Sequence, residues 1–351
     1  MSETAAGAIG LVVNPMSGRD VRRLVGRAQS ETPESKRNQL QRAVVGAAAA
    51  GAERFCWVPD LFRVTERAIE YLDVGVALEQ LDIGRLRTTP DDTIRAVAAM
   101  REAGCKVLVV LGGDGTNRIV ANAWPDAVLM PLSTGTNNVF PEHVEPTLAG
   151  AAAGLVASGR IAVDEVSQPA KLVRVRYADG EERTGVIDAV LVADDHPGSL
   201  LPFDPARIRE VVLARAEPDS VGMSPLGGLL EPCRREDDFG VVVHCVPPGA
   251  GGRPLLAPIS PGIYRTAHVS GVERIALGAP VGVEGPGLIE FDGDRERVLG
   301  AGERAEIRVV RDGPRVIDVA RALRLAAERG LYVDRHWHDH GDLVEGVPGC
   351  C

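Results

Sequence analysis

Residues 105–123, CKVLVVLGGDGTNRIVANA, constrain the fold of this chain more than any other stretch. An apolar run at 107–111 stops at two glycines, and a helix-like segment begins after one aspartate, one more glycine and a threonine. A short apolar run bounded by turn residues is typical of a buried strand. The stretch therefore predicts a strand, a loop whose backbone can approach a ligand closely, and a helix.

Similar units recur through residues 1–158. Strand-like runs lie at 8–14, 53–59, 75–82, 106–113 and 127–132. Helix-like segments lie between or after them, at 37–52, 61–73, 88–105, 116–123 and 149–159. Strands that alternate with helices indicate a mostly parallel sheet with helices on its faces. We therefore expect a Rossmann-like parallel α/β domain over 1–158.

The pattern changes after Gly159. Residues 171–194 alternate with a period of two around ADGEER, which predicts a hairpin. Further strand-like runs are separated by Gly- and Pro-rich loops, at 209–217, 239–246, 273–278, 287–294 and 305–313. This is the pattern of an antiparallel β domain, which we place at 159–305. Residues 315–332 are helical by pattern, and 336–351 form a tail.

Charge and composition exclude some classes of protein. With 39 basic and 49 acidic residues the net charge is −10, which argues against a general nucleic-acid binder. It leaves room for one anionic small molecule, because local backbone dipoles decide such sites. The N-terminus has no basic region of the kind that opens a signal peptide, and the apolar runs are too short to span a membrane. We expect no membrane association.

The cysteines favour a reducing compartment. They form no CxxC pair and no regular framework, so we expect free thiols and a cytoplasmic location. The six are Cys56, Cys105, Cys233, Cys245, Cys350 and Cys351.

The loop that contains Gly112, Gly113, Asp114, Gly115 and Thr116 suggests phosphate chemistry. In open α/β sheets ligands bind where a strand ends and a helix begins. Glycines there permit positive φ angles and bring N–H groups close to phosphate oxygens. A carboxylate would repel phosphate unless it holds Mg²⁺ through water or accepts a proton from an attacking hydroxyl. The alternative is a Gly-rich turn in which Asp114 caps the next helix.

A second polar loop follows the next strand, within residues 129–141, LMPLSTGTNNVFP. It comes at the equivalent edge of the predicted sheet, where a plain Ser/Thr/Asn turn is the alternative. Two such loops after consecutive strands favour a binding site. Its candidate residues are Ser133, Thr134, Gly135, Thr136, Asn137 and Asn138.

These motifs together carry a family resemblance. NPMSG at 14–18, then LGGDGTNR, then PLSTGTNN resemble the NAD kinase and diacylglycerol kinase superfamily, of which GGDGT is the hallmark. Within it the chain most resembles the ATP-NAD kinase-like group that includes the acetoin-catabolism X protein. Supporting stretches are VIDAVLVADD at 186–195, VGMSPLGGLLEP at 221–232 and FDGD at 291–294. The resemblance covers about residues 9 to 330.

The resemblance implies a fold and a reaction. A strand and helix within 306–335 would return to the first domain, and the substrates would meet between the domains. Asp114 would be the base or orienter for an acceptor hydroxyl, while the glycines, the second loop, Asn14 and Asn117 would contact the nucleotide. Mg²⁺ would accompany ATP, and in NAD kinases the acceptor is the 2′-hydroxyl of the adenosine ribose. Enzymes of this superfamily are commonly homo-oligomers.

The acceptor side departs from the NAD kinase pattern. NAD kinases carry an Asn-Glu pair where this chain has VIDAVLV, which leaves Asp188. The segment ARAEPDSVGMSPLGG keeps Ser224, Gly227 and Gly228 but loses most hydroxyls. Two alternatives to an NAD kinase therefore stay open. One is a kinase of another small alcohol or diol, and the other is a nucleotide-binding accessory protein without turnover.

One further motif lies in the tail, DRHWHDHGD at 334–342. On a strand, His336, His338 and His340 would share one face and could bind Zn²⁺ or Ni²⁺. An exposed polar tail is the alternative that we favour, so we assign no metal-ligating residue.

Overall fold

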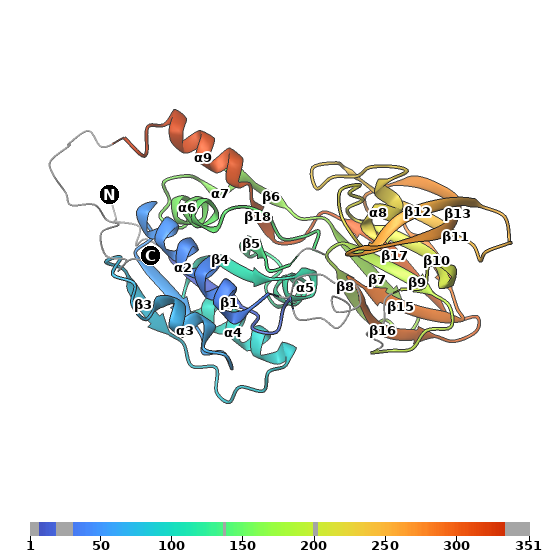
Figure 1. Ribbon diagram of the computed structural model, residues 1–351, viewed down its shortest axis with the longest axis horizontal. Helices are drawn as coiled ribbons and strands as arrows, with labels where there is room; N and C mark the ends of the chain where they lie inside the picture. Colours follow the sequence, from blue (N-terminus) through green and yellow to red (C-terminus); the bar gives the residue numbers. More distant parts are fainter. Residues whose placement is uncertain (1–6, 19–30, 136–137, 199–202, 334–351) are drawn as a thin grey trace.

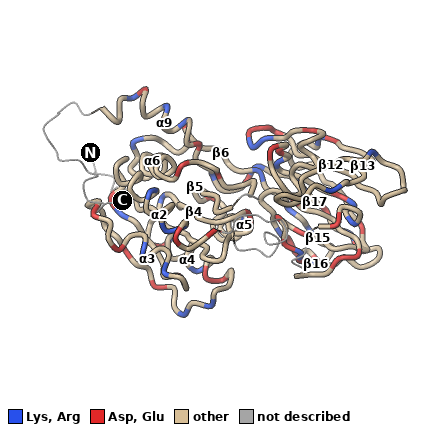
Figure 2. Tube along the Cα trace, viewed as in Figure 1, with Lys and Arg blue, Asp and Glu red and all other residues tan. Residues whose placement is uncertain are grey.

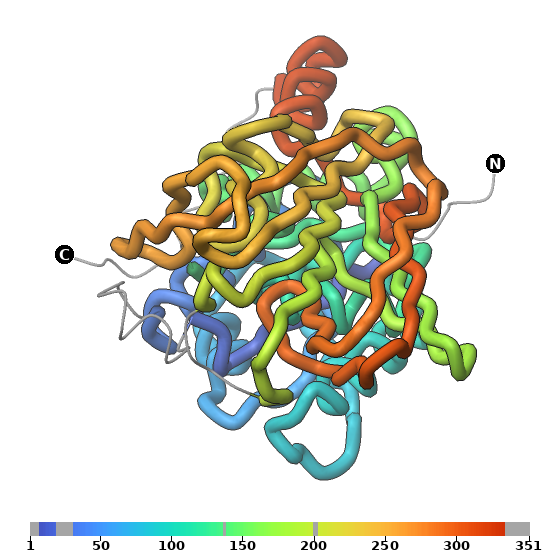
Figure 3. The backbone as a smooth tube through the Cα atoms, turned by 90° about the vertical axis from the view of Figure 1, so that its right-hand side faces the viewer, coloured from blue at the N-terminus to red at the C-terminus, as the bar shows by residue number. Residues whose placement is uncertain are grey.

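The computed structural model describes residues 7–18, 31–135, 138–198 and 203–333. It has an α/β half and an antiparallel β half, which lie side by side in Figure 1. Figure 3 is turned by 90° and looks onto the β half, with the α/β half behind it. The predicted combination of a parallel α/β domain with an antiparallel β domain is confirmed.

The first half is built on a seven-stranded sheet. Its order is β3-β2-β1-β4-β5-β18-β6, and every pairing is parallel except that of β18 with β6. The strands are β1 (Ala8–Val13), β2 (Arg54–Trp57), β3 (Ala77–Gln80), β4 (Cys105–Gly112), β5 (Val128–Ser133), β6 (Ser167–Pro169) and β18 (Arg315–Ile317). The central strands β1 and β4 are almost wholly buried, which explains their continuous apolar runs.

Helices cover both faces of this sheet. One apolar cluster joins the sheet to α2 (Pro33–Ala49), α3 (Val64–Ile69), α6 (Pro146–Ala157) and α9 (Val319–Glu328). A second joins its other face to α4 (Pro90–Glu102) and α5 (Asp114–Ala123). The short α7 (Val163–Val166) leads into β6.

Helices α2 and α6 pack almost backbone to backbone. A Cβ placed on Gly150 would lie 1.9 Å from the carbonyl oxygen of Ala43, and one on Gly46 would lie 2.0 Å from that of Thr147. Only residues without a side chain fit at these crossings. The Ala- and Gly-rich segment of α6 is therefore a packed helix, as its sequence predicts.

The second half consists of two packed antiparallel sheets. The larger has the order β12-β13-β11-β10-β9-β15-β16 and the smaller β14-β17-β7-β8. Apolar side chains from both fill the space between them. The strands are β7 (Leu172–Tyr177), β8 (Glu182–Gly185), β9 (Asp188–Val192), β10 (Ile208–Leu213), β11 (Phe239–Cys245), β12 (Arg253–Ser260), β13 (Ile263–Ala276), β14 (Val281–Glu284), β15 (Gly287–Phe291), β16 (Asp294–Leu299) and β17 (Arg304–Val310). A 3₁₀ turn (Pro205–Arg207) and α8 (Ser224–Gly228) lie in their connections.

The chain passes between the halves twice. It leaves the first sheet after β6, at Pro169, rather than at the expected residue 159. β17 still pairs within the second half, so the return begins after Val310 rather than at 306. β18 then joins β5 in the first sheet, and α9 packs against α6.

Acidic and basic residues are interspersed along the trace of both halves (Figure 2). Cys56, Cys105, Cys233 and Cys245 are buried free thiols. None of the described helices has the length and apolar character needed to cross a bilayer. The three tail histidines and Cys350 and Cys351 lie outside the described residues.

Candidate active site

Asp114 is the first residue of α5, and Gly113 alone separates it from the end of β4. Its carboxylate accepts N–H groups from Val139, at 3.1 Å, and from Phe140, at 2.8 Å. The N-cap position belongs to Gly113, and no side chain caps this helix. The alternative in which Asp114 caps its own helix is therefore wrong. Its carboxylate instead holds the backbone of Val139 and Phe140, which follow the second polar loop.

The loop glycines serve close packing rather than positive φ angles. Gly112, Gly113 and Gly115 are absent from the described glycines with positive φ, which corrects that part of the expectation. A Cβ on Gly112 would lie 2.5 Å from Thr116 Cβ, and one on Gly113 would lie 2.7 Å from Asn138 Oδ1. A Cβ on Gly115 would meet only Asp294 Oδ2, at an ordinary 3.5 Å. Gly115 therefore leaves open space at the start of α5.

The first loop of the chain is tied to this glycine loop. Asn14 Nδ2 donates to Thr116 Oγ1 at 2.8 Å, while Asn14 Oδ1 accepts the Met16 and Ser17 N–H groups. The buried Lys36 ammonium donates to three carbonyl oxygens of residues 14–17. The sequence did not indicate Lys36 as a site residue. A single lysine in a helix has no sequence pattern that would show that it binds the carbonyl oxygens of a distant loop.

The second polar loop is held by its own side chains. Ser133 Oγ donates to the Gly135 carbonyl at 2.7 Å and accepts from Asn138 Nδ2 at 2.9 Å. Thr134 Oγ1 donates to Ser17 Oγ at 2.8 Å. This bond joins the second polar loop to the first loop of the chain, which contains Asn14 and Ser17. Thr136 and Asn137 lie outside the described residues.

Two aspartates of the second half face Asp114 across the cleft. Asp292 follows β15 in the left-handed conformation, with φ of 49°, and accepts the N–H groups of residues 186–188. In return Asp188 accepts the Asp292 N–H at 3.2 Å. Arg118 of α5 lies 3.8 Å from Asp292 and also pairs with Asp294 and Glu296, which joins the two halves. Sequence reasoning missed Asp292, although it had noted FDGD.

Burial and mutual repulsion perturb these carboxyls. Desolvation raises the pKa of Asp114 to about 7, and the charge of Asp292 adds to this effect. The hydrogen bonds from the backbone N–H groups and the charge of Arg215 act in the opposite direction and lower the pKa. The pKa of Asp188 is raised by desolvation and then by Asp292 and Asp114. Desolvation also raises the pKa of Asp292, against the opposing effect of Arg118. A carboxyl with a pKa near neutrality suits general-base chemistry.

A cavity of about 390 Å³ lies between the halves, with Asp114 in its wall. Of the sequence candidates, those that line it are Asn14, Gly113, Asp114, Gly115, Thr116, Asn138, Asp188 and Ser224. The other described candidates are not among the lining residues, namely Gly112, Asn117, Ser133, Thr134, Gly135, Gly227 and Gly228. Asn117, for example, donates to the Gly113 carbonyl at 2.9 Å and so supports the glycine loop.

The segment around α8 contributes to the cavity wall, but the hydroxyl of Ser224 already has hydrogen-bond partners within the protein. Ser224 Oγ accepts the Glu217 N–H and donates to the Arg215 carbonyl, so its hydroxyl is engaged. A Cβ on Gly227 would lie 2.4 Å from Leu213, and one on Gly228 would lie 2.5 Å from the Glu217 backbone. These glycines are required by packing, and the structure does not bring them to the cavity.

The described lining of the cavity carries carboxylates and no basic side chain. No Lys or Arg is among the described residues that line it, so phosphate would be met by N–H groups. No group of three or more His, Cys, Asp or Glu in the described part of the chain is placed to hold a metal ion. Asp114 and Asp294 still present hard oxygen ligands in the wall, and Mg²⁺ is usually bound through one or two carboxylates plus substrate phosphates.

Fold and site define a two-part protein with a glycine loop, between a parallel strand and a helix, in its cleft. The model of the ATP-NAD kinase N-terminal domain matches residues 9–161. The model of the acetoin catabolism protein X C-terminal domain matches residues 171–312.

A curated relative covers nearly the whole chain. Acetoin catabolism protein X of Cupriavidus necator is 33% identical over 342 residues, which are 94% of this chain and 95% of that protein. The chain therefore belongs to the acetoin catabolism protein X family. A crystal structure of yeast NADH kinase complexed with NADH aligns with 97% of this chain and 91% of its own, at 12% identity and a TM-score of 0.49.

Proposed function

We propose that this protein is an ATP-dependent phosphotransferase that phosphorylates a hydroxyl group of a small molecule. NAD is the favoured acceptor, through the 2′-hydroxyl of its adenosine ribose, which would give NADP. The match of residues 9–161 to the ATP-NAD kinase N-terminal domain supports this choice of reaction class.

The observation that carries the proposal is the position of Asp114. Its carboxylate lines the cleft at the start of α5, is oriented by two backbone N–H groups, and has a pKa of about 7. Ionised Asp114 accepts the proton of the acceptor hydroxyl. At the same time the oxygen of that hydroxyl bonds to the γ-phosphorus of ATP, and ADP leaves. The N–H groups at the start of α5 face the transferred phosphoryl group. Mg²⁺, when bound with ATP, neutralises phosphate charge.

The acceptor wall combines the carboxyls of Asp188, Asp292 and Asp294 with apolar side chains. Asp188 reaches the cavity beside Ile187, while Phe203, Met223 and Ile259 also line it. Apolar side chains of this kind suit the flat ring of a nucleotide base, and Asp188 can hydrogen-bond a ribose hydroxyl. Because Asp188 stands where NAD kinases carry Asn-Glu, a different small alcohol or diol is the second candidate.

NADP formation by the full chain, with ATP, Mg²⁺ and NAD, tests the proposal. Asp114→Asn should reduce kcat about 10²-fold or more, because the amide still accepts N–H groups but takes no proton. Asp318→Asn is a matched control, since Asp318 also accepts a backbone N–H, from Arg321 at 2.9 Å, but caps α9. Full activity in Asp114→Asn would exclude the assigned role.

Binding measurements separate the remaining candidates. No NADP from the wild type, with ATP and NAD both bound, would point to the accessory protein. No NADP, with ATP bound but NAD not bound, would point to another acceptor, which a screen of small alcohols would find.

A further inference from the structure

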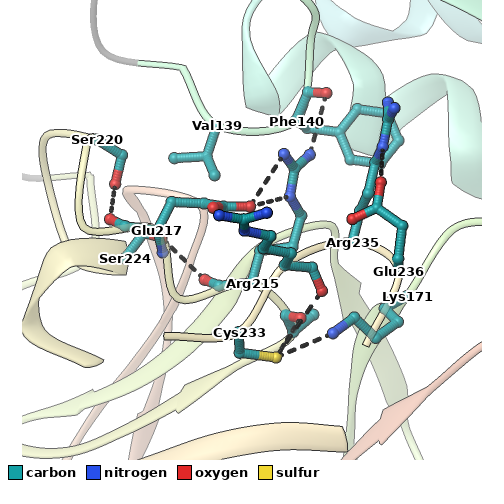
Figure 4. Close-up of polar contacts among 12 residues, drawn as sticks. Val139, Phe140, Lys171, Arg215, Glu217, Ser220, Ser224, Cys233, Arg235 and Glu236 are labelled. Carbon is teal, nitrogen blue, oxygen red and sulfur yellow. Dashed lines mark hydrogen bonds and ion pairs between the residues drawn. The ribbon is translucent and has the colours of Figure 1, made fainter. Parts of the chain in front are cut away.

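Lys171 and Cys233 form a buried pair outside the cleft. Lys171 Nζ lies 3.0 Å from Cys233 Sγ and 2.9 Å from the Phe239 carbonyl oxygen. Cys233 Sγ lies 3.2 Å from the same carbonyl. Lys171 is 2% exposed and Cys233 0%. In Figure 4 the lysine side chain extends directly toward the sulfur atom.

The pair lies beside the contact between the two halves. Lys171 immediately precedes β7, where the chain enters the second half, and Cys233 is bridged to Ala216 after α8. Two residues beyond Cys233, Arg235 pairs with Glu142 and with Asp318 of the first half. A bond between Lys171 and Cys233 would therefore fix the segment that carries Arg235.

The surroundings favour the uncharged forms of both groups. Desolvation lowers the pKa of Lys171, although Cys233 partly opposes this. Desolvation raises the pKa of Cys233, against the opposing effect of Lys171. The Lys171 nitrogen donates a hydrogen bond to the Cys233 sulfur, so the two atoms that would form the bond are already held in contact.

We propose that Lys171 and Cys233 are a covalent modification site, at which hydrogen peroxide converts the pair into an Nζ–Sγ sulfenamide cross-link. The thiol sulfur first attacks the peroxide, whose O–O bond breaks, and this gives a sulfenic acid and one water. The Lys171 nitrogen then attacks that sulfur, the S–O bond breaks, and the departing hydroxide takes a proton from nitrogen as a second water. Sulfur is oxidised by two electrons and peroxide is reduced. A dithiol reverses the reaction and is itself oxidised to a disulfide.

A small cavity reaches the pair from the Lys171 side, and Cys233 itself is not among its lining residues. It has a volume of about 110 Å³ and is lined by Lys171, Arg215 and Arg235 among others. One water needs roughly 10–15 Å³ of such volume, so peroxide fits. Burial slows the first step, because a buried thiol is poorly nucleophilic. Once the sulfenic acid forms, the adjacent amine captures it before solvent does.

The test is a peptide map of the full chain after peroxide treatment, without reductant. We expect cleavage by trypsin after Lys171 to be lost, and residues 161–174 to be joined to residues 216–234 with the loss of two hydrogens. The map is needed because a disulfide between Cys350 and Cys351 would change the intact mass equally. A dithiol should restore both peptides.

Variants and outcomes separate this reaction from general oxidation. Cys233→Ser and Lys171→Arg should each abolish the cross-link, whereas Cys245→Ser, at another buried cysteine, should keep it. The wild-type map decides by itself if a variant fails to fold. Unchanged Lys171 and Cys233 peptides, or a Cys233 peptide that only gains oxygen, would overturn the proposal.

Discussion

The two sides of the cleft are built on different principles. On the α/β side the surface comes from backbone at the ends of neighbouring strands, with Gly115 leaving open space at the start of α5. On the β side it comes from carboxyls, and Asp292 is held by N–H groups 104 to 106 residues away in sequence. Backbone N–H groups can bind the phosphates of any polyphosphate. Side chains held in fixed positions can instead discriminate between acceptor molecules. If the proposed function holds, phosphate binding and acceptor choice should be separable by mutation in this molecule.

The largest effect should come from Asp292→Ala. It leaves the N–H groups of Val186, Ile187 and Asp188 without their acceptor and Arg118 without a buried partner. We expect the free energy of unfolding to fall by about 3–5 kcal/mol in urea titrations. Asp292→Asn should cost less, since asparagine keeps one acceptor oxygen and tolerates the left-handed backbone. Equal losses in both variants would contradict this account.

The next effect concerns pH. Asp114 has its folded-state pKa raised to about 7 from 3.8, so the native protein keeps a proton that the unfolded chain releases. Its contribution to stability is full below about pH 4 and is lost as pH rises through about 7. Asp114→Asn should therefore be more stable than wild type at pH 8, by up to about 4 kcal/mol, and similar at pH 4.

Urea titrations across this range would measure the difference. Asp188 and Asp292 face Asp114 and have raised pKa values, so their own contributions share its sign. Asp114→Asn also relieves their repulsion. A variant less stable than wild type at pH 8 would show that Asp114 is not the strained carboxyl inferred here.

A smaller effect should come from Gly115→Ala. Its Cβ meets only Asp294 at 3.5 Å, and alanine favours a helix, so the melting temperature should hold or rise. The KM for ATP should rise about tenfold, or 1.4 kcal/mol, if phosphate approaches the backbone here. Gly227→Ala is the opposite control, because its Cβ would clash with Leu213 and lower stability while the KM stays unchanged. An unchanged KM in Gly115→Ala would place the phosphates elsewhere.

The smallest effect should come from Asp294→Ala. This side chain is 51% exposed, and Arg118 keeps Asp292 and Glu296 as partners when it is removed. We expect the free energy of unfolding to change by at most about 1 kcal/mol. A loss of stability as large as that of Asp292→Ala would mean that the exposed Asp294 and the buried Asp292 contribute to stability as one unit through Arg118.

Local motifs predicted the α/β side well. The strand that ends at Gly112 and the helix that begins at Asp114 are adjacent in sequence, so their spacing alone places Asp114 at the sheet edge. Roles within the loops were harder to predict. Ser133 and Thr134 looked like ligand contacts, but in the structure they bond to Gly135 and Ser17, since buried polar groups find partners.

The acceptor side could be predicted only in part. Resemblance to a family motif indicates Asp188, Ser224, Gly227 and Gly228 as candidates. The structure shows Ser224 bonded to Glu217 and Arg215, and Gly227 packed on Leu213. Asp292 was missed because its importance comes from strands far apart in the chain.

Sequence by itself determined the two-part architecture, the glycine loop and the family. Each of these follows from local periodicity or from residues a few positions apart. Only the tertiary structure decided that Asp114, Asp188 and Asp292 face one another, that their carboxyls are desolvated, and that Lys171 meets Cys233. Burial and the approach of distant strands set those properties, because desolvation and charge repulsion depend on separation in space and not on separation along the chain.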